Sequence, residues 1–302
     1  MNVYRFRIPF VKPIPFKGEM HSHREGVLLE RNGRWAEASP LPGFSSESIA
    51  EVVSALRDGA QPPPSLDFAL STLDRELKGP LNVPYNQLLM GDQSEVLAAA
   101  QGNADSNCAA VKLKVGRQSL DADVRLARDV KASLPQGVSL RLDANQAWSF
   151  EEAIEFHRAT EGTEFEYIEE PLKDPMRLES LYSQTGIRYA VDESLVGNHS
   201  LEHWPNAAAF ICKPTILGGR HAIERLAKAG KPIVFSSAFE SGVGVIRIMQ
   251  LAAEFSPQIP AGLDTLSWMQ EDLLLHAPQK QDGFMSVGEL AVDESKLEPV
   301  QI

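Results

Sequence analysis

The feature that most constrains the fold is a regular alternation of short apolar segments with amphipathic segments, beginning near residue 84. Strands that alternate with helices at this pitch form parallel βα units. Eight such units in roughly 200 residues favour a closed (β/α) barrel, near the lower size limit of that fold. An open doubly wound sheet is the alternative. The expected strands lie near residues 87–90, 110–115, 138–143, 165–169, 189–192, 208–213, 232–236 and 260–263.

The first 83 residues predict a different, α+β arrangement. Residues 27–38 read as a hairpin that turns at Asn32-Gly33, a pair suited to the positive φ angles of a type I′ turn. A helix should run from near Ser46 to Arg57, and Ser48 and Glu51 have capping-box spacing at its start. A second helix should begin with Ser65 as its N-cap and continue through Leu77.

These patterns divide the chain into three parts. We expect an α+β capping domain at residues 1–83 and a barrel at residues 84–284. The remaining segment, residues 285–302, should return to pack on the capping domain.

Composition excludes several classes of function. A net charge of −12 without a basic run argues against a nucleic-acid surface, which needs clustered Lys and Arg. No run approaches the roughly 18 to 20 apolar residues of a membrane span. Cys108 and Cys212 match no zinc spacing and read as reduced, buried side chains. We therefore expect a soluble cytoplasmic protein that binds a small molecule, with a monomer favoured over a homo-oligomer.

Charged residues end five successive expected strands, on the face opposite the aliphatic one. Alternate side chains of a strand face opposite ways, so Lys112 and Lys114 share a face that Leu113 does not. The same parity groups the other charged strand residues, which are Arg141, Asp143, Glu169, Asp192 and Lys213. A barrel directs such strand ends to its C-terminal mouth, where enzymes of this fold keep their active sites.

The residue types at these ends suggest metal-assisted proton chemistry. Asp143, Glu169 and Asp192 offer the all-oxygen ligands that Mg²⁺ prefers, and Mn²⁺ could substitute. A partly desolvated lysine among other cations has a lowered pKa and can act as a base. Each short motif alone is typical of a solvated strand end. The ordered set K-x-K, D-x-N, EEP, DES and CKP, one strand apart, is hard to explain by chance.

This ordered set resembles the enolase superfamily, and within it the muconate-lactonising branch, which places lysines on barrel strands two and six. The mandelate-racemase branch would place a histidine on strand seven, where this chain has Ser236 and Ser237. The resemblance narrows to the o-succinylbenzoate synthase family of menaquinone biosynthesis. It is weakest in residues 11–25, which look shorter than the family's mobile lid. It is carried by the segments RWAEASPLPGFS, LRLDANQAW, IEEPLK, VDESL, SSAFESGVG and GLDTL.

The resemblance implies a fold, a reaction and a set of roles. The fold would be a modified (β/α)8-type barrel, (β/α)7β, with an N-terminal α+β capping domain. The reaction would be Mg²⁺-dependent syn-dehydration of 2-succinyl-6-hydroxy-2,4-cyclohexadiene-1-carboxylate to o-succinylbenzoate, a hydro-lyase reaction. Lys114 would remove the ring proton and return it to the departing hydroxyl, Lys213 would stabilise charge on the opposite face, and Lys112 would lower the pKa of Lys114. The metal ligands would be Asp143, Glu169 and Asp192; the substrate-binding residues would be Arg141, Ser236, Ser237, Gly262, Leu41, Pro42, Gly43, Phe44 and Ser45.

Several alternatives stay open at this point. The same two lysines could serve as opposed bases of an N-acylamino acid racemase or a dipeptide epimerase. Arg141 could instead be a structural partner of a carboxylate. Gly242-Val243-Gly244 lacks the rest of a dinucleotide fingerprint and is better explained as the start of the seventh barrel helix. His21 and His23, expected in a loop, receive no role.

Overall fold

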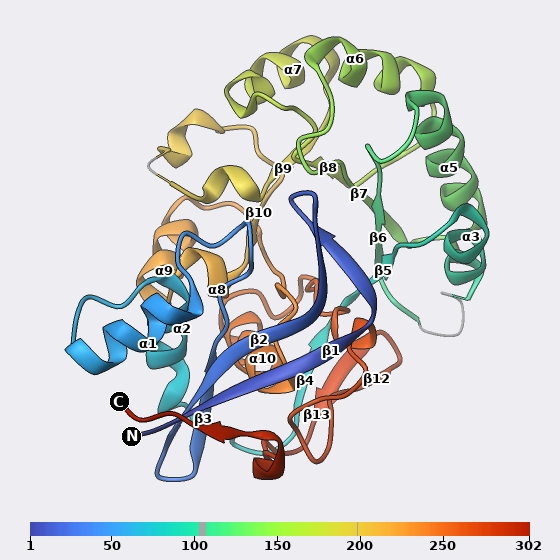
Figure 1. The fold of residues 1–302 in the computed structure, drawn as a ribbon. Helices are drawn as coiled ribbons and strands as arrows, with labels where there is room; N and C mark the ends of the chain where they lie inside the picture. The colour runs from blue at the N-terminus through green and yellow to red at the C-terminus, as the bar shows by residue number, and fades with distance from the viewer. Residues whose placement is uncertain (103–106, 198) are drawn as a thin grey trace.

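A parallel sheet of seven strands curls into most of a barrel (Figure 1). The computed structural model describes residues 1–102, 107–197 and 199–302. The strands, in spatial order, are β5 (Asn86–Leu89), β6 (Ala110–Lys114), β7 (Ser139–Asp143), β8 (Tyr167–Glu169), β9 (Tyr189–Val191), β10 (Ala209–Cys212) and β11 (Ile233–Phe235).

Residues 260–263 close the gap between β11 and β5 without forming a strand. Single parallel bridges join Ser236 to Gly262 and Tyr85 to Ala261, so the ring is continuous. The expected eighth strand is therefore reduced to two bridges. Pro260 has no N–H to donate to a ladder, which limits regular pairing here.

Helices cover the outside of this sheet as an arc (Figure 1). Side-chain caps begin several of them, as at Ser149, which forms a capping box with Glu152. The Gly242-Val243-Gly244 stretch does begin the last of these helices. Between β9 and β10 the described residues form two 3-10 turns in place of an α-helix. The helices are α3 (Gln93–Gln101), α5 (Leu120–Ser133), α6 (Phe150–Ala159), α7 (Leu178–Thr185), α8 (Pro214–Leu217), α9 (Arg220–Lys228) and α10 (Gly242–Phe255).

The two faces of the barrel strands are chemically distinct, as the alternation predicts. Aliphatic residues such as Leu113 and Leu142 point outward into the main core, and Phe210 and Cys212 join them. The inward face carries a separate small apolar cluster below the charged strand ends. Burial of the outward face against the helices is the main stabilising contribution, at about 25 cal/mol per Å² of apolar surface.

The N-terminal unit consists of an antiparallel sheet and two helices with a core of their own. Its strands are β1 (Asn2–Phe16), β2 (Glu19–Arg31) and β3 (Arg34–Ala38), and its helices are α1 (Ile49–Asp58) and α2 (Pro64–Leu73). Asn32 and Gly33 both have positive φ, and Ser48 forms the expected capping box with Glu51. The N-cap prediction for Ser65 is wrong by two residues, because the N-cap is Pro63. The helix α2 begins at Pro64, whose fixed φ suits a first helical position, and it ends before Leu77.

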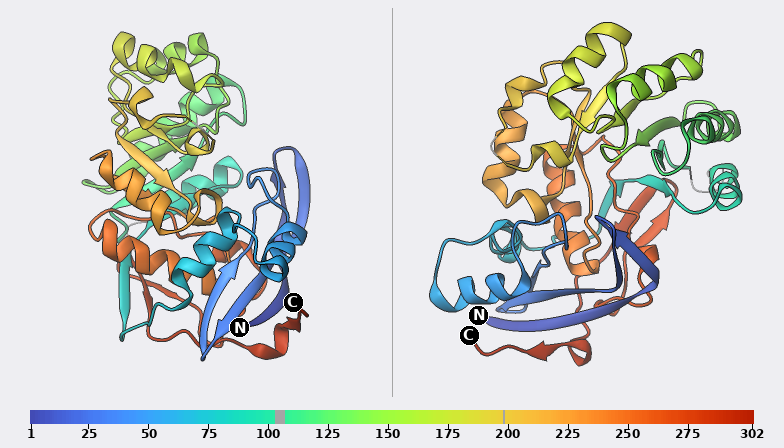
Figure 2. Two further views of the ribbon diagram at one scale, coloured as in Figure 1. Left: turned by 90° about the vertical axis from the view of Figure 1, so that its left-hand side faces the viewer. Right: turned by 45° about the horizontal axis from the view of Figure 1, so that its top comes forward.

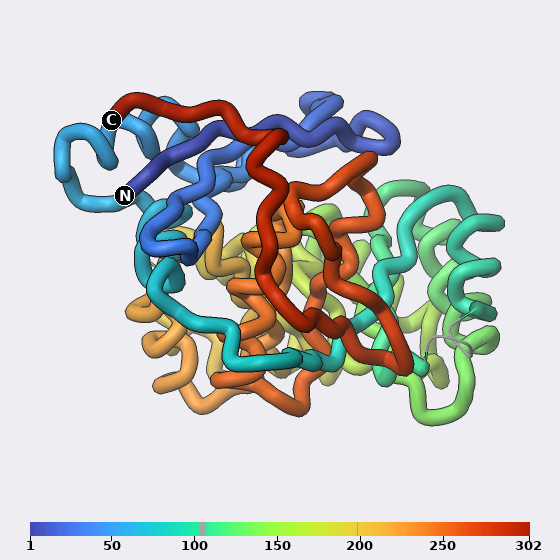
Figure 3. The backbone as a smooth tube through the Cα atoms, turned by 90° about the horizontal axis from the view of Figure 1, so that it is seen from below, coloured from blue at the N-terminus to red at the C-terminus, as the bar shows by residue number. Residues whose placement is uncertain are grey.

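The last part of the chain completes two sheets. The antiparallel strands β12 (Gln279–Gln281) and β13 (Phe284–Val287) join β4 (Leu81–Pro84), and β14 (Glu298–Pro299) pairs with β1. The two termini therefore lie side by side (Figure 3). The three-part division at residues 83 and 284 stays a prediction. The 3-10 turns are η1 (Pro175–Arg177), η2 (Glu193–Leu195), η3 (Leu201–His203), η4 (Leu266–Trp268) and η5 (Glu294–Lys296).

The N-terminal sheet forms a layer beside the barrel and is fastened to α10 (Figure 2). The buried Glu37 of β3 accepts hydrogen bonds from the backbone N–H groups of Ser241 (3.1 Å) and Gly244 (3.0 Å). In the opposite direction, Arg247 of α10 donates to the carbonyl of Trp35 (2.8 Å). Among the helices of the described ranges, none combines the length and apolarity needed to cross a bilayer.

Candidate active site

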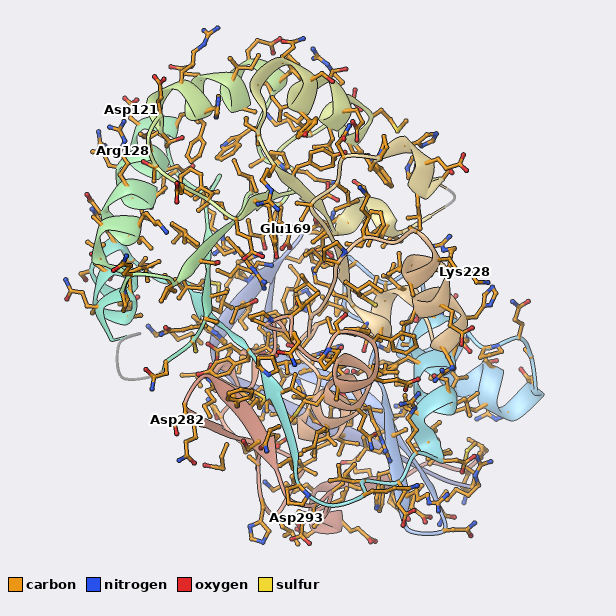
Figure 4. The ribbon with its side chains drawn as sticks, turned by 180° about the vertical axis from the view of Figure 1, so that it is seen from behind. Asp121, Arg128, Glu169, Lys228, Asp282 and Asp293 are labelled. Carbon is orange, nitrogen blue, oxygen red and sulfur yellow. The ribbon has the colours of Figure 1, made fainter. Side chains whose placement is uncertain are left out.

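Charged side chains meet at the C-terminal ends of the barrel strands. Lys112 and Lys114 come from β6, and Asp143 and Glu169 end β7 and β8. Asp192 and Lys213 directly follow β9 and β10. Figure 4 shows the labelled Glu169 inside the ring of strands, whereas Asp121, Arg128 and Lys228 lie on outer helices. The structure thus brings together six of the seven charged residues that the strand parity grouped; the seventh, Arg141, lies deeper in the barrel.

Ion pairs connect the lysines of β6 to the carboxylates that end β7 and β8. Lys112 Nζ lies 2.7 Å from both Asp143 Oδ2 and Glu169 Oε1. Lys114 Nζ contacts the same Asp143 oxygen at 2.5 Å and donates to Asn145 Oδ1 at 2.8 Å. Asp143 and Glu169 are almost fully buried, so these contacts are weakly screened by solvent.

A further ion pair lies on the other side of the barrel, where Lys213 contacts Asp192. Four strand positions separate β6 from β10 in the sheet order, which is halfway around a ring of seven strands and a closing segment. Lys114 and Lys213 therefore approach the mouth from opposite sides.

Electrostatics distinguishes Lys114 from the other two lysines. Burial lowers the pKa of the Lys114 ammonium, and the charges of Lys112 and Lys213 add to this against the opposing effect of Asp143. Burial also acts on Lys112, but Asp143 and Glu169 outweigh it, and the pKa of Lys112 is raised. For Lys213, Asp192 and Glu193 likewise outweigh burial and raise the pKa. Lys114 is therefore the lysine best suited to act as a base.

The carboxylates also differ from one another. Burial opposes ionisation of Asp143, but Lys112 and Lys114 hold its pKa well below its ordinary value. Burial and then repulsion by Asp143 raise the pKa of Glu169 to about 8. Burial raises the pKa of Asp192 as well, despite the neighbouring Lys213. The three carboxylates are matched in number by the three lysines, and Glu169 is held under repulsion from Asp143 and Asp192.

That charge balance bears on whether these residues could hold a divalent cation. As they stand, no three ligand-type side chains in the described ranges converge on one metal position, because lysine ammonium groups pair with the carboxylates. The donor set nevertheless suits Mg²⁺, since it is all oxygen and Glu169 remains under repulsion from Asp143 and Asp192. The residues fit such an ion in donor chemistry.

A cavity of about 350 Å³ lies over these charged ends. The three lysines line it from below, and Ser236, Ser237 and Gly262 line it at the closing edge of the barrel. The N-terminal unit supplies the opposite wall through Leu41, Phe44 and the β1–β2 hairpin, whose Lys17 Nζ lies 4.9 Å from the centre of the Phe44 ring. A site of this size suits a small-molecule ligand.

Some residues expected at the substrate do not line this cavity. Arg141 is buried beneath it and forms a bidentate pair with Glu166 (2.8 and 3.2 Å), because it precedes Asp143 by two residues and points inward one layer lower. The structural alternative for Arg141 is therefore favoured. Gly43 lines a neighbouring pocket of about 210 Å³. Pro42 and Ser45 line neither cavity, although Ser45 Oγ shapes this loop by accepting from the Leu41 N–H (2.8 Å).

Sequence reasoning missed other residues of the cavity wall. Asn145 and Glu193 line it, and both stand inside motifs that were used only for their aspartates. Phe239 also lines it, with a φ of 62° that no sequence pattern signals. The histidine pair was expected in a loop but lies in β2, where His21 packs on Phe16 and His23 pairs with Glu25.

Comparisons with known proteins agree with this architecture. Residues 94–291 match the sequence family described as enolase C-terminal domain-like. The chain is 32% identical to o-succinylbenzoate synthase of Klebsiella pneumoniae (strain 342), over 92% of this chain and 94% of the relative. It is 30% identical to o-succinylbenzoate synthase of Haemophilus influenzae, over 90% of this chain and 92% of that protein.

Two solved structures show the same fold at lower identity. The o-succinylbenzoate synthase of Thermosynechococcus elongatus, complexed with Mg, superimposes with a TM-score of 0.75 at 24% identity, covering 91% of this chain and 95% of that one. A dipeptide epimerase of Cytophaga hutchinsonii, complexed with Mg and a dipeptide, gives 0.80 at 20% identity, covering 99% and 98%. The family match and the curated relatives together assign the chain, which belongs to the enolase superfamily and, within it, to the o-succinylbenzoate synthase family of lyases.

Proposed function

We propose that this enzyme dehydrates 2-succinyl-6-hydroxy-2,4-cyclohexadiene-1-carboxylate to o-succinylbenzoate in menaquinone biosynthesis, with a divalent cation as cofactor. The observation that carries the proposal is the pair Lys114 and Lys213 on opposite sides of one cavity, with three carboxylates between them. The relatives from Klebsiella and Haemophilus support the choice of reaction, because the similarity extends over nine tenths of the chain.

Asp143, Glu169 and Asp192 would hold the cation, which is Mg²⁺ in the structure from Thermosynechococcus. When bound, Mg²⁺ supplies a Lewis acid for the carboxylate of the substrate. We expect Mn²⁺ to replace it, since it accepts the same oxygen ligands.

Lys114 performs both proton transfers in this proposal. Its amine removes the proton from the ring carbon that bears the carboxylate, and the electron pair of that C–H bond enters the ring system. The resulting ammonium then gives the proton to the neighbouring hydroxyl, the C–O bond breaks, and water leaves from the same face. The lowered pKa of Lys114 supports this role, because a base must be deprotonated before it can act.

Lys213 and Lys112 remain charged throughout. The raised pKa of Lys213 suits a cation that stabilises developing negative charge from the far side of the ring. Lys112 lowers the pKa of Lys114 and keeps Asp143 and Glu169 in position through its ion pairs. Ser236, Ser237 and Gly262 would contact the succinyl tail, and Leu41 and Phe44 would exclude water above it.

The same lysine pair also favours a second candidate, racemisation of an N-acylamino acid or epimerisation of a dipeptide. Purified protein should be stripped with EDTA, reloaded with Mg²⁺ or Mn²⁺, and assayed on the cyclohexadiene, on an N-succinylamino acid and on a dipeptide. We expect metal-dependent turnover of the cyclohexadiene that exceeds the other two activities. Turnover of the amino acid or dipeptide alone would replace the proposal with the isomerase reaction.

A further inference from the structure

Two polar residues of the cavity wall, Asn145 and Glu193, are connected to Lys114 by a short hydrogen-bond chain. Lys114 Nζ donates to Asn145 Oδ1 at 2.8 Å, and Asn145 Nδ2 donates to Glu193 Oε1 at 2.9 Å. The bond to Glu193 fixes which end of the Asn145 amide faces the lysine, because an amide turned around would present its NH₂ group to an ammonium.

The backbone around Asn145 is held in a conformation that ordinary residues seldom adopt. Asn145 and Gln146 are consecutive residues with φ angles of 45° and 60°. Three backbone hydrogen bonds fasten the loop to the end of β8, from Ala144 N, Gln146 N and Trp148 N to carbonyl oxygens of residues 169–171 (3.0, 2.7 and 3.2 Å). Strained backbone of this kind gathers at functional sites, where the surroundings over-determine it.

Hydrogen bonds to Glu170 also fix the turn that carries Glu193. The buried Glu170 accepts hydrogen bonds from the N–H groups of Asp192 (2.8 Å) and Ser194 (2.9 Å), which fixes the turn that carries Glu193. Glu170 also accepts from Gln146 Nε2 at 3.2 Å, so one side chain supports both loops.

The side-chain hydrogen bond of Glu193 is confined to this chain of contacts, although its charge also acts on Lys213. Within the described part of the chain, the Glu193 carboxylate accepts one side-chain hydrogen bond, from Asn145 to Oε1. Its Oε2 atom is buried without a donor. Among the described residues, Lys114 has one other side-chain partner, the Asp143 oxygen that it shares with Lys112. Of the two acceptors that contact Lys114 here, Asn145 is therefore the one that Lys112 does not share.

We propose that Asn145 and Glu193 are positioning residues for the proton-transferring lysine, with Asn145 holding Lys114 and Glu193 acting through Asn145. The inference rests on the proposed function for its kinetic consequence, since a misdirected base slows proton transfer without weakening substrate binding. A displacement of about 1 Å in a reacting group can reduce a rate about 100-fold.

The kinetic test compares Glu193→Leu, Glu193→Gln, Asn145→Ala and the double variant, with Glu202→Leu on the exposed η3 turn as the matched surface control. Glu193→Leu should lower kcat about 10- to 100-fold and leave KM within about threefold of the wild type. Glu193→Gln should keep most of kcat, because its amide oxygen can still accept from Asn145. The double variant should be no slower than Asn145→Ala, because Glu193 acts through Asn145.

Additive losses in the double variant, or a Glu193→Gln variant as slow as Glu193→Leu, would overturn the proposal. Titration with Mg²⁺ alone gives a second criterion. The Mg²⁺ affinity should be equal in the wild type and in Glu193→Leu. A Mg²⁺ affinity that falls together with kcat would mean that Glu193 acts through Asp192 instead.

Crystal structures of the substrate-free variants make the test independent of the reaction. Lys114 Nζ should stay within hydrogen-bond distance of Asn145 Oδ1 in Glu193→Gln and leave it in Glu193→Leu. If Lys114 stays in both, Glu193 does not position it. If the wild type turns over none of the three substrates, the proposed function fails, and the crystal structures still decide the positioning.

Discussion

Glu37 makes the stability of the folded chain depend on pH in a direction opposite to that of most salt-bridged carboxylates. Its side chain is fully buried between β3 and α10, with Arg24 and Glu240 as charged neighbours. Burial, the largest effect, raises the pKa from 4.5 to about 7, although hydrogen bonds from Ser241 and Ser39 act against it. The folded state therefore binds a proton more tightly than the unfolded state does.

The sign and size of the effect follow from linkage. Between pH 4.5 and about 7 the folded state carries more protons than the unfolded state, so the free energy of unfolding falls as pH rises. The stabilisation is fully present below pH 4.5 and lost as pH rises through about 7. The pKa difference corresponds to about 3 kcal/mol, of which about 2.5 kcal/mol falls between about pH 5 and about pH 8.

Glu37→Gln isolates this contribution, because glutamine keeps the size of the side chain and cannot ionise. Urea unfolding of both proteins should be measured across this pH range. The difference in unfolding free energy, wild type minus variant, should fall by about 2–3 kcal/mol from about pH 5 to about pH 8. A difference that is constant with pH, or that rises, would refute the argument that burial dominates at Glu37.

Three further substitutions test the site. Gly262→Ala would bring a Cβ to 2.7 Å from Ser236 Oγ, so the serine must turn into the cavity and KM should rise about tenfold, equivalent to about 1.4 kcal/mol of binding; an unchanged KM would mean that this edge does not contact the substrate. Arg141→Met should lower the free energy of unfolding by about 2–3 kcal/mol with KM nearly unchanged, because the Asn86 side-chain oxygen and the Pro260 carbonyl lose their buried donor. A large rise in KM at normal stability would restore Arg141 as a substrate ligand. Glu170→Gln should lower Tm while Mg²⁺ affinity, measured by calorimetry, stays close to that of the wild type; an abolished Mg²⁺ affinity would indicate that the assignment of ligands at the end of β8 is wrong.

The position of the charged strand ends could be predicted because two simple regularities coincide there. Alternation along a strand has a period of two, and the aliphatic face of a barrel strand must pack on the helices. Once Leu113 faces outward, Lys112 and Lys114 must face inward. The hairpin at Asn32-Gly33 was predictable for a similar reason, since few residue pairs accept two positive φ angles.

Features that depend on depth or on distant segments could not be predicted. Strand parity predicted that Arg141 faces the inside of the barrel. It could not predict how deep below the mouth the side chain lies, because that depends on where the strand ends. The wall formed by Phe16 and Lys17 comes from a hairpin more than 90 residues before Lys112. The bond between Asn145 and Glu193 joins two loops whose conformation is fixed by Glu170.

The measurement that tests the central claim most directly is turnover of the cyclohexadiene by Lys114→Arg beside Lys213→Arg. Arginine keeps the positive charge but does not release a proton near neutral pH. Because Lys114 must carry a proton twice and Lys213 only stabilises charge, Lys114→Arg should show no activity above background, and Lys213→Arg should retain measurably more. Turnover by Lys114→Arg at a rate near that of the wild type would remove Lys114 as the base and contradict the mechanism.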